Sequence, residues 1–63
     1  MQVTQEYLDG IADGRETYAR EGMEHAADHL ANLKATIRGF AASSPVGQYL
    51  RGERDFWIHK LKR

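Results

Sequence analysis

Apolar residues recur at three- and four-residue steps along the first part of the chain. This spacing predicts an amphipathic helix whose inward stripe is Tyr7, Leu8, Ile11, Ala12, Tyr18 and Ala19. Thr4 is the expected N-cap, and Glu6 in the first turn is favourable to the helix dipole. Gly10 and Gly14 lie on or beside the stripe, one turn apart. Because each glycine costs about 1 kcal/mol relative to alanine in an exposed helix, we expect another helix to approach closely there.

A second amphipathic stripe follows an interruption at Glu21-Gly22-Met23. Its members are Met23, Ala26, Ala27, Leu30, Leu33, Ile37 and Phe40. Arg38 and Gly39 give the basic residue and the glycine that are typical of a helix C-terminus. Around the interruption, Tyr18, Gly22 and Ala27 have the offsets of the turn in a tetratricopeptide-type hairpin, which favours two helices joined at Gly22. The alternative is one helix from Thr4 to Gly39, which would give a protein of two long antiparallel helices.

The third predicted helix begins at Ser44-Pro45, an N-cap followed by a proline that needs no amide donor. Its expected buried residues are Val46, Tyr49, Leu50, Phe56, Trp57 and Leu61, while Ile58 falls outside this stripe. The helix therefore has more apolar surface than one partner helix covers, which favours a contact between subunits. The fold prediction is a single all-α domain over residues 1–63, a helical hairpin plus a C-terminal helix, completed by homo-oligomerisation. The expected interface residues are Gly10, Gly14, Tyr49, Trp57 and Ile58.

Length and composition strengthen the prediction of self-association. A chain of 63 residues has a small core, and small domains usually need a disulfide, a metal or a partner subunit. Because the sequence has no cysteine, disulfides and thiolate zinc sites are excluded. The polar, acidic start MQVTQEYLDG does not resemble a signal peptide, and no apolar run has membrane-spanning length. The default expectation is a soluble cytoplasmic protein without a cofactor.

The net charge is zero, which disfavours a protein that works by gripping the nucleic acid backbone. The charge is nevertheless uneven: residues 1–21 carry five acids against two arginines, and residues 51–63 carry five bases against two acids. We expect the acidic face of the first helix and the arginine- and tryptophan-containing face of the third to bind a partner, because Arg and Trp are enriched at binding hot spots. The predicted partner-binding residues are Glu6, Asp9, Asp13, Glu16, Arg51, Arg54 and Trp57.

Few residues point to catalysis or to a metal. His25 and His29 lie one turn apart and are weak candidates for metal ligands; the preferred interpretation is that they pair with acids on the first helix. Ser43 and Ser44 are the hydroxyl candidates, but they are expected to cap the third helix, and no histidine lies near them in the sequence. We therefore expect a protein that is not an enzyme.

The start of the third helix is a candidate anion site. Free amides after Ser44, the positive end of the helix dipole and the two serine hydroxyls suit a phosphate or carboxylate. Arg51 and Arg54 would join this site if another helix or subunit brought them near. The alternative is an ordinary N-cap with arginines that face the solvent.

The C-terminal string ASSPVGQYLRGERDFW, which lies within residues 41–57, resembles the short proteins encoded in tailed-phage and prophage genomes. The resemblance implies a phage accessory protein that acts in the cytoplasm of a bacterial host, a group that includes inhibitors of host defence and transcription. Three hypotheses follow: a homo-oligomer that binds and inhibits a host protein, an oligomer that sequesters a small anionic ligand such as a cyclic nucleotide, and a small helix-turn-helix DNA-binding protein. Zero net charge and aromatic residues in the third helix oppose the last of these.

Overall fold

Three α-helices make up the computed structural model, which describes residues 3–62: α1 (Gln5–Glu21), α2 (Ala26–Ile37) and α3 (Pro45–Leu61). The all-helical prediction is confirmed. None of these helices combines the length and the apolar character that a bilayer-spanning segment needs.

The predicted helix ends are confirmed at three places. The Thr4 hydroxyl accepts a hydrogen bond from the Tyr7 amide at 3.1 Å, and the Ser44 hydroxyl accepts one from the Gly47 amide at 2.9 Å, with Pro45 in the first turn of α3. Gly22 ends α1 with φ at +67°, a left-handed conformation that glycine adopts without a Cβ penalty. The alternative of one helix from Thr4 to Gly39 is therefore wrong.

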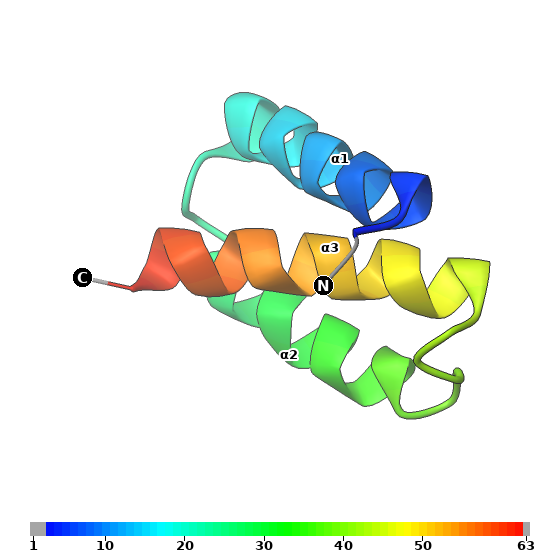
Figure 1. Cartoon of the computed structure of the whole chain (residues 1–63). Coiled ribbons are helices and arrows are strands. Elements are labelled where there is room, and N and C mark those ends of the chain that lie inside the picture. The colour runs from blue at the N-terminus through cyan, green and yellow to red at the C-terminus, as the bar shows by residue number, and fades with distance from the viewer. Residues whose placement is uncertain (1–2, 63) are drawn as a thin grey trace.

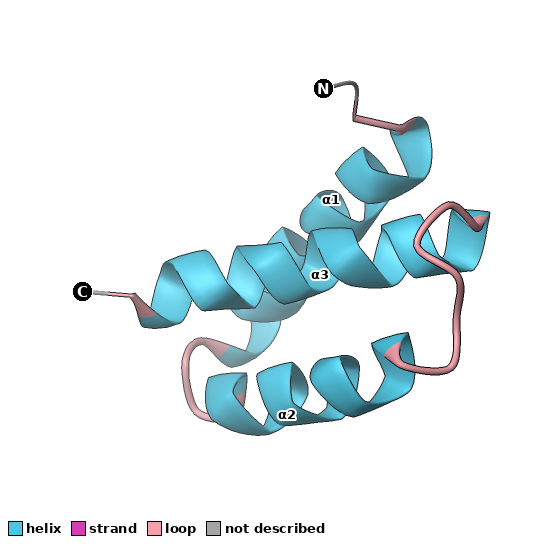
Figure 2. Ribbon diagram, turned by 60° about the horizontal axis from the view of Figure 1, so that its bottom comes forward, coloured by secondary structure: helices cyan, strands magenta, loops and turns pink. Residues whose placement is uncertain are grey.

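The helix α3 lies between the other two, as Figures 1 and 2 show. It runs in the same direction as α1 and antiparallel to α2 (Figure 1). Within the described chain, α1 and α2 both pack on α3 and not on each other. The expected packed hairpin of the first two helices is wrong in this respect, because the turn at residues 22–25 leads α2 to the other side of α3.

The core lies where the three helices meet. It consists of Ala26, Phe56 and Trp57, with Ile11, Tyr18, Leu30 and Leu33 partly buried around it. Trp57 is the largest fully buried side chain, at 1% exposure. Trp57 and Phe56 were expected to be buried, and so was Ile37, which is 8% exposed.

Several residues that the apolar spacing predicted to be buried are exposed instead: Leu8, Ala12, Ala19, Met23, Ala27, Phe40, Val46 and Leu61. On α1 the reason is the glycines. The buried residues of this helix are Gly10 and Gly14, so the face that meets α3 is rotated from the apolar stripe toward the glycine side. Met23, Phe40, Val46 and Leu61 lie at helix ends or in turns, beyond the reach of the core.

Candidate binding surfaces

The contact between α1 and α3 is a close approach of two backbones. A Cβ placed on Gly10 would lie 2.0 Å from the Tyr49 carbonyl oxygen, and one placed on Gly52 would lie 2.1 Å from the Tyr7 carbonyl oxygen. The expectation that another helix approaches Gly10 and Gly14 is confirmed. That helix is α3 of the same chain, so the assignment of these glycines to an interface between subunits needs correction: their surfaces are already covered.

Two hollows flank this glycine contact. The larger one, of about 490 Å³, is the aromatic–cationic pocket, lined by Tyr7, Ile11, Arg15, Tyr18, Asp55, Phe56, His59 and Lys60. The smaller one, of about 250 Å³, is the acidic hollow, lined by Asp13, Glu16, Thr17, Arg20, Tyr49 and Glu53. On α1, the residues of the two hollows project on opposite sides of the line through Gly10 and Gly14, as helical periodicity requires.

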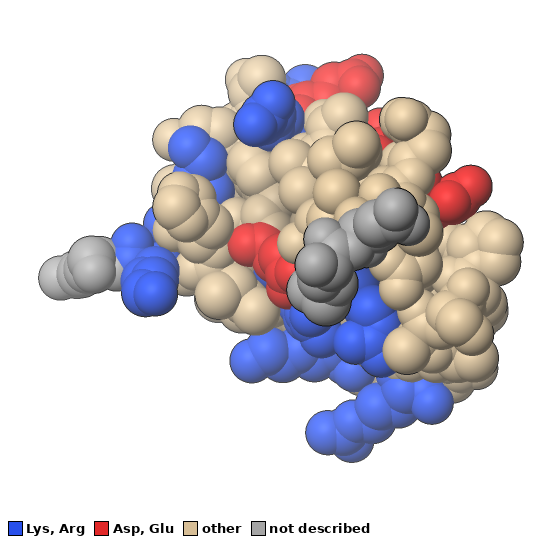
Figure 3. All heavy atoms as spheres, in the orientation of Figure 1, with Lys and Arg blue, Asp and Glu red and all other residues tan. Residues whose placement is uncertain are grey.

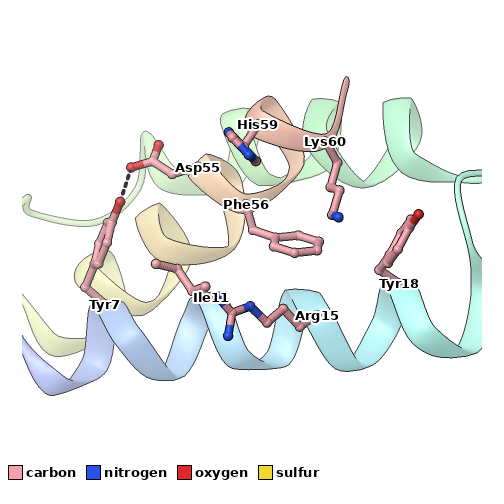
Figure 4. Close-up of a pocket in the computed structure, with 8 residues that line it drawn as sticks. All are labelled: Tyr7, Ile11, Arg15, Tyr18, Asp55, Phe56, His59 and Lys60. Atoms are coloured by element: carbon pink, nitrogen blue, oxygen red, sulfur yellow. Dashed lines mark hydrogen bonds between the residues drawn. The ribbon is translucent and has the colours of Figure 1, made fainter. Parts of the chain in front are cut away.

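Rings and cations converge in the aromatic–cationic pocket (Figure 4). The Lys60 ammonium reaches from α3 to 4.5 Å from the centre of the Tyr18 ring and 5.7 Å from that of Phe56. These distances are in the range of cation–π attraction. Arg15 extends along the α1 wall beside Ile11 (Figure 4). Within residues 3–62, neither Arg15 nor Lys60 forms an ion pair with a carboxylate.

Asp55 is the one carboxylate among the residues that line this pocket. It accepts a hydrogen bond from the Tyr7 hydroxyl at 2.6 Å and pairs with the Arg54 guanidinium at 2.9 Å. The hydrogen bond to Asp55, with some burial, raises the pKa of Tyr7 above its ordinary value. The negative charge of Asp55 is therefore already compensated, and the remaining charge of the pocket is positive.

The acidic hollow has the opposite character. The Tyr49 hydroxyl donates a hydrogen bond to Asp13, which is the main reason why the pKa of Tyr49 is raised. Burial, and then repulsion from Asp13, raise the pKa of Glu53. Within the described chain no group of three His, Cys, Asp or Glu side chains has the arrangement of a metal site. The hollow is thus an acidic surface feature without a ligand set.

The predicted acidic residues on α1 are exposed: Glu6, Asp9, Asp13 and Glu16. Two of them have partners within the chain, because Asp9 accepts a hydrogen bond from Gln5 at 2.9 Å and Asp13 accepts one from Tyr49. Glu6 and Glu16 form no ion pair or side-chain hydrogen bond within residues 3–62. Lys and Arg side chains gather over α2 and α3 and toward the C-terminal end of α3, with others near the end of α1 (Figure 3).

The predicted binding face of α3 is only partly available. Trp57 is 1% exposed and stacks on the His29 ring at 5.2 Å, so its assignment to a partner or subunit interface is wrong: α2 covers it. Arg54 pairs with Asp55, and Arg51 is half-buried, with an Nε that has no hydrogen-bond partner in the described structure. Tyr49 is half-buried against α1, whereas Ile58 is 40% exposed, as expected for a residue outside the buried stripe.

The predicted anion site at the start of α3 is filled by the chain itself. The Ser44 hydroxyl accepts from the Gly47 amide and donates to the Ala41 carbonyl, each at 2.9 Å. A Cβ on Gly47 would lie 2.2 Å from the Ala41 oxygen, so the loop presses on the first turn of the helix. Ser43 is exposed in this loop, and the ion pair with Asp55 commits Arg54 elsewhere. This start of the helix is therefore an ordinary capped N-terminus.

The two histidines have separate roles. His29 forms a hydrogen bond with Glu21 at 3.1 Å, so the predicted pairing of a histidine with an acid on the first helix is confirmed for His29. This hydrogen bond is the main reason why the pKa of Glu21 is lowered. His25 occupies the N-cap position of α2 without a side-chain capping bond, and its ring lies 6.5 Å from that of His29.

The exposed apolar residues mark one further surface. Residues 39–50 contain no charged side chain, and Phe40 and Val46 within them are 41% and 49% exposed. We name this segment the uncharged end. The helices α1 and α3 begin at the same end of the molecule, and Leu8, in the first turn of α1, is 46% exposed. Figure 3 shows a continuous surface without charged side chains over the loop and the start of α3.

Sequence reasoning missed the aromatic–cationic pocket. One sign of it was present, because Tyr7, Ile11, Arg15 and Tyr18 follow one another at steps of four, four and three residues on one face of α1. The other half comes from α3, some forty residues later, and its alignment with α1 depends on the parallel crossing at the glycines. Comparison of the chain with protein-family models, curated proteins and solved structures finds no match.

Proposed function

We propose that this protein is a non-enzymatic, phage-type accessory protein that associates with itself and binds a host protein. The observation that carries the proposal is the uncharged end, where Phe40 and Val46 expose apolar surface in a segment without charges. Contiguous apolar surface on a small domain is typical of an interaction site. The phage context comes from the resemblance of residues 41–57.

Self-association is assigned to the uncharged end, and host binding to the acidic strip of α1, which consists of Glu6, Asp9, Asp13 and Glu16. A second copy suits the uncharged end because apolar surfaces of one kind complement each other in a symmetric contact. The acidic strip suits a basic host surface. Its members Glu6 and Glu16 extend into solvent with no partner among the described residues, so their charge is available to steer and orient an encounter.

The arrangement of the helices favours protein binding over helix-turn-helix DNA binding. In a helix-turn-helix protein the recognition helix projects into the major groove. Here α3 is the central helix and is covered on two sides by α1 and α2. Its aromatic residues Phe56 and Trp57 belong to the core.

Light scattering coupled to size exclusion tests self-association. The wild-type chain, with a monomer mass of 7.2 kDa, is expected to elute as a multiple of that mass. The double variant Phe40→Ser/Val46→Ser is expected to elute as a folded monomer. The matched control is Met23→Ser/Leu61→Ser, which removes two exposed apolar side chains elsewhere and should keep the wild-type mass. If the wild-type protein is still a monomer at about 100 μM, its self-association is too weak for a functional oligomer. That result would overturn this part of the proposal.

Host binding is tested with a partner that is first captured from bacterial lysate, then identified and purified. The variant Glu6→Gln/Glu16→Gln should weaken that reconstituted complex about tenfold, mainly in the association rate and most strongly at low salt. The control Glu24→Gln/Asp28→Asn removes the same charge from the turn before α2 and from its first turn, and should leave affinity unchanged. Equal affinity for all three proteins would contradict the role of the acidic strip.

A further inference from the structure

We infer that the aromatic–cationic pocket between α1 and α3 binds a small ligand that joins a flat ring to a phosphate, the chemistry of a nucleoside monophosphate. The volume of about 490 Å³ falls within the range of small-molecule sites, roughly 300–1,000 Å³. The lining has the composition of such a site, with a mostly apolar surface and a few converging polar groups.

The apolar part of the pocket suits a flat ring. Tyr7 and Tyr18 stand at its two ends on α1, and Phe56 lies between them from α3 (Figure 4). Phe56 and Tyr18 already meet edge to face, with centroids 6.2 Å apart, and Phe56 is held in the core by Trp57. These rings are therefore fixed in place before a ligand arrives, which lowers the entropic cost of binding one.

The cationic part suits a phosphate. Arg15 presents the planar donor group that matches phosphate oxygens, and Lys60 supplies a second positive charge from the other helix. The Lys60 ammonium is positioned by the faces of Tyr18 and Phe56, at 4.5 and 5.7 Å, and not by a carboxylate. A phosphate would thus meet cations that no acid within residues 3–62 already neutralises.

The positive charge of the pocket also favours a phosphate over a metal ion or an organic cation. Asp55 is neutralised by Arg54 and hydrogen bonded to Tyr7, so it does not favour a metal ion or a cationic group. His59 adds a further nitrogen donor to the pocket. The site shares no residue with the uncharged end or with the acidic strip. It therefore stands or falls independently of the proposed protein contacts.

The experiment is a titration of the whole chain, labelled with ¹⁵N, with AMP at low ionic strength. Saturable amide shifts are expected at Ile11, Arg15, Tyr18, His59 and Lys60. Adenosine and inorganic phosphate, the two halves of the probe, should each bind at least tenfold more weakly, because each loses one set of contacts. Absence of saturable shifts up to about 10 mM AMP, or equal binding of AMP and inorganic phosphate, would overturn the inference.

Variants locate the site and control for folding. Arg15→Gln and Lys60→Gln should each weaken AMP binding about tenfold, the usual effect of removing one charge-assisted contact. Both side chains are exposed, so these variants should keep the wild-type stability. The matched controls Arg20→Gln, on α1, and Lys62→Gln, at the C-cap of α3, remove cations outside the pocket and should bind AMP as the wild type does. If the controls weaken binding as much as the pocket variants, AMP is held by general charge and the site is wrong.

Discussion

The two helix contacts of α3 are built in different ways. Against α1, the centre of the contact is backbone: Gly10 and Gly52 let each helix touch the other's carbonyl oxygens, with no space for a Cβ, and side chains meet only on either side of it. Against α2, it consists of side chains. There Leu30 and Leu33 pack on the core cluster that contains Trp57, and Trp57 stacks on the His29 ring at 5.2 Å.

The difference explains where the hollows lie. When two backbones approach this closely, the larger side chains on either side of the glycines have to splay outward, and space is left between them. The aromatic–cationic pocket and the acidic hollow lie along this contact, one on each side of the glycine line. A contact filled by an indole ring leaves no such gap, and close packing of side chains supplies most of the hydrophobic stabilisation. The contact with α2 thus stabilises the fold, and the contact with α1 shapes the candidate sites.

The largest expected effect comes from emptying the side-chain contact. Trp57→Ala should cost about 3–5 kcal/mol of unfolding free energy, because it removes the only large side chain that is fully buried among residues 3–62 and leaves a cavity. That approaches the whole stability expected of so small a domain, so the variant should be largely unfolded. Circular dichroism with urea denaturation measures the change.

Leu33→Ala sharpens this prediction. Leu33 touches the same cluster but is only half-buried, so its loss should be smaller, about 1–2 kcal/mol. A Trp57→Ala protein that unfolds cooperatively within about 1 kcal/mol of the wild type would show that the fold does not depend on the contact with α2.

The next largest change in stability is expected from adding a Cβ at the close backbone contact between α1 and α3. In an unhindered helix, glycine to alanine gains about 1 kcal/mol. We expect Gly10→Ala instead to lose about 1–3 kcal/mol, because the new Cβ meets the Tyr49 carbonyl and the helices have to separate. Urea denaturation gives the sign directly.

The same substitution at two further glycines gives stability changes to compare with that of Gly10→Ala. At Gly14 the new Cβ would meet the side chain of the buried Phe56 at 2.7 Å, and not backbone, so Gly14→Ala should also lose stability, by displacing that ring. At Gly39 the nearest atom is 3.5 Å away, an ordinary contact, and Gly39→Ala should be close to neutral. If all three variants were equally stable, the close approach of α1 and α3 would be wrong.

The sequence predicted well what local chemistry decides. The caps at Thr4 and Ser44, the proline at the start of α3 and the break at Gly22 each follow from one or two neighbouring residues, and each is confirmed. The close approach at Gly10 and Gly14 was also predicted, since glycines in a helix need a packing reason. Its partner was not, because nothing in α1 alone distinguishes a helix of the same chain from one of another subunit.

The features that the sequence did not predict depend on how segments far apart in the chain align in space. Gly52 received no role from the sequence, since it lies in an alternating charged run that is typical of an exposed helix face, yet it meets the backbone of Tyr7. The pocket needs Arg15 from α1 and Lys60 from α3 in one lining, and the parallel crossing of these two helices brings both residues to it. Trp57 has the residue type of a binding hot spot, but the path of the turn at residues 22–25 brings α2 over it. None of these relations is encoded in a local pattern.

The smallest expected effect distinguishes the two contacts by pH. The pKa of Glu53, beside the α1 contact, is raised, chiefly by burial and then by Asp13, so the folded protein binds this proton more tightly than the unfolded chain does. Its ionised form therefore opposes folding. The penalty is absent below the ordinary glutamate pKa of 4.5 and appears as the pH rises through the raised value. Glu21, which links α1 to His29 on α2, has the opposite sign. Its lowered pKa gives stability that is present above 4.5 and lost as the pH falls through the lowered value.

Glu53→Gln should accordingly stabilise the fold at pH 7 by a few tenths of a kcal/mol, a small gain because solvent screens a half-exposed carboxylate. The gain should shrink toward pH 4.5, where the wild-type carboxyl is itself protonated. Glu21→Gln should instead destabilise at pH 7, with the difference from wild type disappearing in acid. Urea denaturation at pH 7 and at acidic pH measures both variants, with Glu24→Gln as an exposed control. If Glu53→Gln were less stable than wild type at neutral pH, its carboxylate would be a favourable partner in the α1–α3 contact. The acidic hollow would then be a stabilising feature of that contact and not a cost of it.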